Sequence, residues 1–122
     1  MAQVAAGEFS SGERYVIDEA IRRAETLCRF EFSVFVGHAE GDSRAFAPPH
    51  HNSLVAPSRS ILVMVDPTLR AVEVVTGGEV RRHLTDAEAA LAVEEMTRSF
   101  AEGDLAGVLT RGIRLLAEHA RA

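Results

Sequence analysis

One short segment of the chain gathers several side chains that can bind a metal ion. His38, Asp42, His50 and His51 lie within fourteen residues, around the pair Pro48-Pro49. Imidazole and carboxylate groups suit zinc, and carboxylates also suit calcium. The spacing matches no established metal motif, and the prolines leave the relative geometry open. Two interpretations therefore stand: a divalent-metal site for calcium or zinc, and, more simply, a solvated loop whose histidines bind nothing.

A second candidate site is the sequence Thr76-Gly77-Gly78-Glu79, which follows a predicted strand. Ligands of open α/β sheets favour crevices at strand ends. Paired glycines let the backbone come close to an anion, a metal ion or a cofactor. A simple strand-ending turn would use the same glycines. We keep these four residues as candidate cofactor-binding residues beside the simpler turn.

The remaining polar residues do not complete a catalytic set, so catalytic residues stay unassigned. Asp66 is explained by a turn at Asp66-Pro67, and Glu73 alternates with apolar neighbours as an edge-strand charge would. Cys28 falls in an apolar helical stripe, where a buried thiol is inert. The sequence contains no P-loop, nucleophile elbow, His-Glu-x-x-His or Cys-x-x-Cys motif.

Length and composition restrict the class of protein. The 122 residues have room for one domain, and 47% hydrophobic with 25% charged residues is ordinary globular usage. The net charge of −5 disfavours a nucleic-acid partner. Residues 1–9 lack signal-peptide features, and no apolar run is long enough for membrane insertion. We expect a flexible leader at 1–9, a single domain at 10–122, and a soluble cytoplasmic protein.

Hydrophobic periodicity and capping signals predict three helices. A capping box of Ser10 and Glu13 opens a helix over 10–29, and one of Thr85 and Glu88 opens a helix over 85–101. Asp104 caps a third helix, which ends near residue 119. The predicted buried stripes of the first two include Val16, Ile17, Ala20, Ile21, Ala24, Leu27, Cys28, Ala89, Leu91, Ala92, Val93, Met96 and Phe100.

Three strands are predicted between these helices. Residues 30–36 alternate, 61–65 are apolar at every position, and 70–76 return after the turn at Asp66-Pro67. Pro48-Pro49 argues against a continuous helix through 38–58, so we expect an irregular loop there, with short helical turns at most. The order helix-strand-loop-strand-strand-helix-helix predicts a three-layer α/β/α sandwich on a small mixed sheet. Its first two strands are parallel and its last two antiparallel.

The order and residues of this chain resemble the TPM domain. The resemblance rests on the apolar strand 61–65, the return strand 72–75 with Thr76-Gly77, the helix start Leu84-Thr85-Asp86, and Phe100-Ala101-Glu102-Gly103-Asp104 between two helices. Within that superfamily the chain looks closest to a short actinobacterial branch of unknown function. The resemblance implies an α/β/α sandwich. For some members it also implies divalent-cation binding near the strand ends and a modest phosphatase activity.

The chain departs from the family pattern in ways that bear on function. Pro57-Ser58-Arg59 replaces the family's Asp-Asn-Gly, and the family's helix between the first two strands reads as shortened or broken. These departures favour a non-enzymatic module that binds a protein partner, an ion or a second copy of itself. The alternative is a weak divalent-metal-assisted phosphatase with a strand-end cleft formed by Asp66, Thr76, Gly77, Glu79 and the loop histidines.

Overall fold

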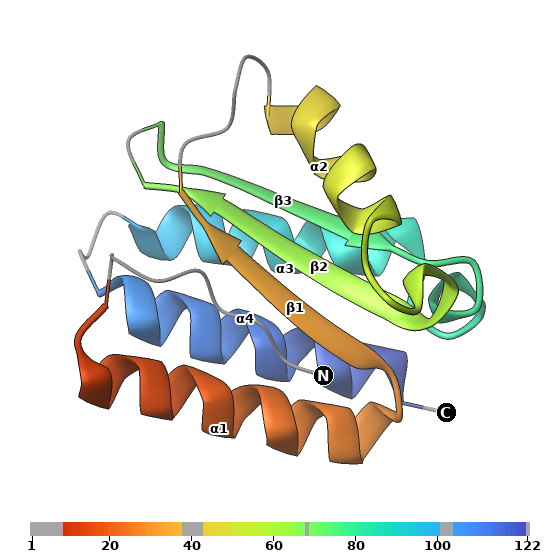
Figure 1. Cartoon of the computed structure of the whole chain (residues 1–122), viewed down its shortest axis with the longest axis horizontal. Coiled ribbons are helices and arrows are strands. Elements are labelled where there is room, and N and C mark those ends of the chain that lie inside the picture. Colours follow the sequence, from red (N-terminus) through yellow and green to blue (C-terminus); the bar gives the residue numbers. More distant parts are fainter. Residues whose placement is uncertain (1–8, 38–42, 68, 101–103, 122) are drawn as a thin grey trace.

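The molecule is an α/β/α sandwich with three helices on one face of a sheet and one helix on the other (Figure 1). The structure is a computed structural model that describes residues 9–37, 43–67, 69–100 and 104–121, with the backbone alone for 43–46 and 50. The three-helix layer contains α1 (Ser11–Cys28), α3 (Asp86–Ser99) and α4 (Leu105–Ala120), and α2 (Ser43–Asn52) covers the opposite face. The predicted fold class is confirmed.

The sheet has the predicted topology. Strand β2 (Ser60–Asp66) lies between β1 (Glu31–Val36), which is parallel to it, and β3 (Ala71–Thr76), which is antiparallel. All seven residues of β2 are buried, as the uninterrupted apolar run predicted. Because β3 runs back along β2, Thr76 pairs with Ile61 and Ala71 pairs with Asp66. The turn after Thr76 therefore lies at the amino ends of the parallel pair.

The residues of β2 divide between two cores. Ile61, Val63 and Val65 belong to the large core under the three helices, which also contains Ile17, Ile21, Phe32, Met96, Leu109, Ile113 and Leu116. Leu62 and Met64 pack in a smaller core with Ala47 of α2. Each of these aliphatic side chains adds about 1.5–3 kcal/mol on full burial. The central strand thus holds both helix layers in place.

The predicted helix caps are present. Ser10 Oγ accepts a hydrogen bond from Glu13 N at 3.1 Å, and Ser10 N donates to Glu13 Oε1 at 3.0 Å. Thr85 and Glu88 form the same reciprocal pair at the start of α3. Asp104 accepts from Gly107 N at 3.0 Å at the start of α4. These bonds satisfy backbone donors that a helix leaves without intrahelical partners.

The prediction of an irregular loop over 38–58 is wrong in its middle part. Helix α2 runs from Ser43 to Asn52 and contains both Pro48 and Pro49. Proline removes a helical donor and crowds the carbonyl four residues earlier, so the two prolines weaken this helix. Ala47 and His51, one turn apart, are 1% and 4% exposed, and α2 packs against β2 and β3. This packing overrides the local preference, so the helix between the first two strands is not broken.

Helices α3 and α4 approach each other closely at Gly112. A Cβ built at this buried glycine would overlap the side chain of Met96. The absence of a side chain at Gly112 therefore allows the two helices to pack closely. No helix in the described part of the chain is long and apolar enough to cross a membrane.

Candidate functional site

The residues Thr76 to Glu79 form a tight turn against the segment that leads into β2. Gly77 N donates to Ser60 O at 3.0 Å, and Glu79 N donates to Ser58 O at 2.9 Å. A Cβ at Gly77 would overlap the backbone of Pro57 and Ser58. Chain packing therefore accounts for this glycine without a ligand, while the cofactor-binding role of the four residues stays a prediction.

Side-chain contacts also join the ends of the strands here to neighbouring segments of the chain. Glu79 accepts from Ser58 Oγ at 3.1 Å and from Arg59 Nη1 at 3.2 Å. Arg59 Nη2 also donates to Arg29 O at 2.8 Å, and its guanidinium lies 5.1 Å from the ring centroid of Phe30. Glu79 and Arg59 therefore tie the strand ends to the end of α1, which is a structural role.

The predicted phosphatase cleft is not assembled. Asp66 lies at the far end of the hairpin, where its carboxylate accepts from Leu69 N at 3.2 Å as the turn prediction required. Asp66 lies five positions along β2 from Ile61, the partner of Thr76, which corresponds to about 17 Å. The grouping of Asp66 with Thr76, Gly77 and Glu79 is wrong, because a hairpin places its turn and its open end at opposite edges.

Of the four predicted metal ligands, the structure describes the side chain of His51 alone. His38 and Asp42 lie outside the described residues, as does the side chain of His50. His51 is buried, and its Nε2 lies 2.9 Å from Ser60 O. A carbonyl only accepts, so Nε2 carries the proton of this hydrogen bond. In the described part of the chain no three His, Cys, Asp or Glu side chains gather as metal ligands, and the four-residue site stays a prediction.

His51 does share a hollow with part of the second candidate site. The hollow has a volume of about 220 Å³ and lies between the last turn of α2 and the end of β3. It is lined by Pro48, His51, Asn52, Pro57, Ser58, Val75, Thr76, Gly78 and Arg81. Arg81 Nη1 donates to Thr76 O across it. The structure thus brings together His51, Thr76 and Gly78, which the sequence analysis placed in two separate sites.

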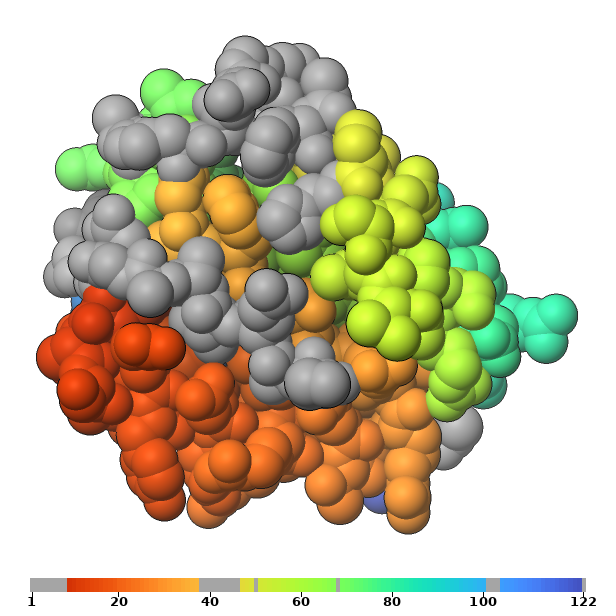
Figure 2. All heavy atoms as spheres, in the orientation of Figure 1, coloured from red at the N-terminus to blue at the C-terminus, as the bar shows by residue number. Residues whose placement is uncertain are grey.

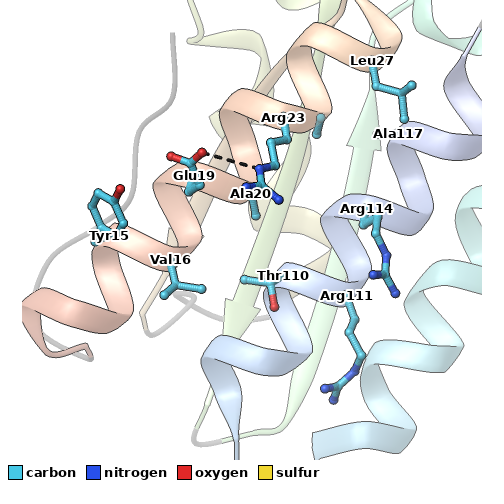
Figure 3. Close-up of a pocket in the computed structure, with 11 residues that line it drawn as sticks. Tyr15, Val16, Glu19, Ala20, Arg23, Leu27, Thr110, Arg111, Arg114 and Ala117 are labelled. Carbon is cyan, nitrogen blue, oxygen red and sulfur yellow. Dashed lines mark ion pairs between the residues drawn. The ribbon is translucent and has the colours of Figure 1, made fainter.

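A second hollow is a groove between α1 and α4, which we call the α1–α4 groove. Its volume is about 360 Å³, and it is lined by Tyr15, Val16, Glu19, Ala20, Arg23, Ala24, Leu27, Thr110, Arg111, Arg114 and Ala117. Figure 3 shows Val16 and Leu27 of α1 facing Thr110 and Ala117 of α4. In Figure 2, α1 (red to orange) is exposed at the surface along its length. The lining residues Val16 and Leu27 are partly exposed, so the groove is open to solvent beside the large core.

The groove has exposed apolar side chains in its lining and charged side chains of both signs at its edge. Tyr15, Val16 and Leu27 are 64%, 51% and 38% exposed. On the edge, Glu19 is already engaged by Arg22 at 2.6 Å and Arg23 at 3.5 Å, and the hydrogen bond from Arg22 holds the Glu19 pKa below its ordinary value.

Two further arginines of α4 line the groove and also border Glu94, Glu95 and Glu118 in a hollow on the α3 side. Arg111 and Arg114 of α4 are exposed, and neither forms an ion pair with any residue that the structure describes. Figure 3 shows both side chains running from α4 away from α1, and both also line a hollow between α3 and α4. The α1–α4 groove therefore combines apolar side chains with arginines from both helices.

Sequence reasoning missed this groove because it predicted Val16, Leu27 and Leu91 to be buried. They are 51%, 38% and 58% exposed. The buried residues of α1 are only Ile17, Ile21, Ala24 and Cys28. A helix that packs against one core needs a single apolar stripe, with residues three to four positions apart. Val16 and Leu27 are apolar residues outside that stripe, and they were the available signal of a second contact surface on α1.

Comparison with known proteins places the chain in a family. The sequence pattern of a family described as a domain of unknown function, DUF5130, matches residues 2–117. The chain belongs to this family. An uncharacterized protein of Mycobacterium tuberculosis, present in strains CDC 1551 and H37Rv, is 28% identical to this DUF5130 chain over 108 residues. The match covers 88% of the chain and 65% of the relative, so the chain spans less than two thirds of the relative's length.

Solved structures share the fold of this DUF5130 domain at low identity. The BA42 protein of the psychrophilic bacterium Bizionia argentinensis has a TM-score of 0.77 at 17% identity, over 93% of this chain and 82% of that one. An N-terminal domain from P. gingivalis has a TM-score of 0.72 at 18% identity, over 96% of this chain and 79% of that one. At this identity the likeness concerns the fold alone.

Proposed function

We propose that this DUF5130 domain is a non-enzymatic, TPM-like binding module, and that its α1–α4 groove holds an acidic amphipathic helix of a protein partner. One observation carries the proposal. An apolar groove open to solvent has two arginines, Arg111 and Arg114, on its edge that pair with no described residue. The TPM resemblance supports the proposal through the α/β/α sandwich that it implied.

The apolar floor supports a docking role. Contiguous exposed apolar surface bordered by polar residues is typical of interaction sites, whereas single exposed apolar side chains are ordinary. Here Tyr15, Val16 and Leu27 line one groove together. Val55 and Leu69 are also exposed, at 97% and 62%, but neither lines this groove. The grouping of apolar residues, rather than their exposure alone, distinguishes the groove.

The shape of the groove supports a helical occupant. Helices α1 and α4 lie side by side and run in the same direction (Figures 1 and 3). The α1 lining extends from Tyr15 to Leu27, which corresponds to about 18 Å along the axis. An occupant helix of about twelve residues has that length. Helix-in-groove docking uses apolar anchors at i, i+3, i+4 and i+7, which span about 10 Å and would meet Val16 and Ala20 in turn, and a further anchor one turn later would meet Leu27.

The charge of the edge selects an acidic occupant. Glu19 is compensated by Arg22 and Arg23. Arg111 and Arg114 form no ion pair with a described residue, although Glu94, Glu95 and Glu118 line a hollow with them on the α3 side. Carboxylates of a partner helix would lie along this edge, and arginine binds carboxylate through a planar pair of donors. A nucleic acid is a poorer match, because the groove floor is apolar and the chain carries a net charge of −5.

The direct test is the affinity for a synthetic helix of the stated chemistry. A fluorescein-labelled peptide of about fourteen residues, with leucines at i, i+3, i+4 and i+7 and flanking glutamates, is titrated with the domain and followed by anisotropy. We expect saturable binding in the micromolar range, weakened about tenfold by the double change Arg111→Glu and Arg114→Glu. The same peptide with lysines in place of glutamates should not bind.

Matched controls separate the groove from the rest of the surface. Val16→Ser should weaken binding, whereas Val55→Ser, at a fully exposed position outside the groove, should leave it unchanged. Arg82→Glu provides the corresponding charge control outside the groove. Equal affinity in all variants contradicts the proposal. Sedimentation that shows a dimer which the Arg111/Arg114 change dissociates would make the occupant a second copy of the chain, and would also overturn it.

A further inference from the structure

The hollow at the end of β3 has a positively charged group in its lining. Among the described residues that line its 220 Å³, Arg81 is charged and none is Asp or Glu. The carboxylate of Glu79, next to Gly78 in the chain, accepts from Ser58 and Arg59. A hollow with an arginine and no carboxylate in its lining favours an anion over a cation. This observation is independent of the α1–α4 groove.

Arg81 is held in position before any ligand arrives. Its Nη1 donates to Thr76 O, the last residue of β3. Its Nη2 lies 4.0 Å from the Cβ position of Gly78, so the guanidinium folds back over the turn. Its remaining N–H groups keep the planar arrangement that matches two oxygens of a phosphate group. Because the side chain is already fixed, less conformational entropy is lost on binding.

The rest of the lining adds donors and leaves space. Asn52 carries an amide group, and Gly78 has no side chain to cover the backbone beside Arg81. Within the described residues, Gly78 N makes no backbone hydrogen bond, whereas the neighbouring Gly77 N and Glu79 N do. His51 Nε2 is committed to Ser60 O, which fixes the ring orientation. The hollow is smaller than the roughly 300–1,000 Å³ of sites for drug-sized ligands, so a small group fits it best.

We infer that this hollow is a binding site for a phosphate group, either inorganic phosphate or the phosphate of a small phosphomonoester, with Arg81 as its charged anchor. The proposed role is binding alone, without a chemical reaction, so the site needs neither metal ligands nor a nucleophile. Thr76 and Gly78, which the sequence analysis predicted as cofactor-binding residues, then form part of the wall of this anion site. Gly77 is excluded from the wall, because it packs on Pro57 and Ser58.

The test is an amide ¹H–¹⁵N titration of the full chain with inorganic phosphate and, separately, with glycerol 2-phosphate at constant ionic strength. Constant ionic strength is needed because exposed charges are screened by salt. We expect saturable shifts for the amides of Asn52, Ser58, Gly78 and Arg81 at millimolar ligand. Tighter binding of inorganic phosphate supports a free-anion ligand, and tighter binding of the ester supports a phosphorylated small molecule.

Two arginine variants keep the inference falsifiable. Arg81→Gln should weaken phosphate binding by about tenfold or more, because the charged pair of donors is lost. Arg82→Gln, at the next residue but outside the hollow, should bind as the unmodified chain does. Amide shifts of Arg81→Gln away from the hollow should be unchanged, which shows that the variant is folded. Shifts that do not saturate, or that are equal in both variants, mean an adventitious ion only and overturn the inference.

Discussion

Replacing Gly77 by alanine adds one methyl group at the tightest backbone contact of the sheet end. The new Cβ would overlap the carbonyl oxygen of Pro57 and the carbonyl group of Ser58. These are backbone atoms, and hydrogen bonds from Gly77 N to Ser60 O and from Glu79 N to Ser58 O hold the two segments together. The overlap therefore cannot be relieved by a change of rotamer.

The magnitude follows from two opposing effects. Overpacking of a tight site costs about 1–3 kcal/mol. Glycine to alanine also stabilises by about 0.4–1 kcal/mol when the backbone conformation is compatible, because the unfolded chain loses freedom. For Gly77→Ala the overlap prevails, and we expect a net destabilisation of about 2 kcal/mol. This corresponds to a decrease in Tm of roughly 6–10 °C for a domain of this size.

Urea unfolding monitored by far-ultraviolet circular dichroism measures this difference. Gly78→Ala is the matched control, because the nearest atom to its Cβ is Arg81 Nη2 at 4.0 Å. We expect Gly78→Ala to unfold within about 0.5 kcal/mol of the unmodified chain. If the two variants unfold at the same urea concentration, the close approach of Gly77 to Pro57 and Ser58 is not a feature of the protein in solution.

Three further predictions concern the capping box of α3 and the metal site. Thr85→Ala removes the bond that Glu88 N donates to Thr85 Oγ1 at 3.1 Å, and should cost about 1 kcal/mol in urea unfolding; an unchanged midpoint would refute the cap. The hydrogen bond from Thr85 N lowers the pKa of Glu88 below 4.5, with His119 adding to the effect. A lowered pKa stabilises the fold fully above the unfolded value of 4.5, and this contribution is lost as the pH falls through the folded value. Glu88→Gln should therefore unfold more easily than the unmodified chain at neutral pH, with a difference that shrinks below pH 4.5; a difference independent of pH contradicts the linkage. For the metal site predicted at His38, Asp42, His50 and His51, zinc and calcium titration calorimetry should give a saturable isotherm weakened by Asp42→Asn and His50→Gln, and heats that are equal in all three chains would reject it.

The predictable parts of this fold are those that depend on neighbours in sequence. Both capping boxes join residues three apart, so Ser10 with Glu13 and Thr85 with Glu88 could be identified from spacing. The central strand could be identified because burial on both faces leaves no polar position in 61–65. Their order then fixed the sheet and its layers.

The parts that could not be predicted depend on contacts distant in sequence. Helix α2 forms despite Pro48 and Pro49, because Ala47 and His51 pack against the sheet and this packing outweighs the local propensity. The need for glycine at position 77 comes from a segment twenty residues earlier. The groove requires knowledge that α1 lies against α4, more than eighty residues later, whose arginines then border Val16 and Leu27.

The central claim is that the α1–α4 groove binds an acidic amphipathic helix, and an amide shift map with the acidic peptide tests it most directly. The account predicts that the largest shifts fall in two separate segments, residues 15–27 of α1 and 110–117 of α4, which line the groove from opposite sides. Residues of α2 and of the phosphate hollow should not shift. Shifts confined to α2, α3 or the hairpin, or no shifts at saturating peptide, would contradict it.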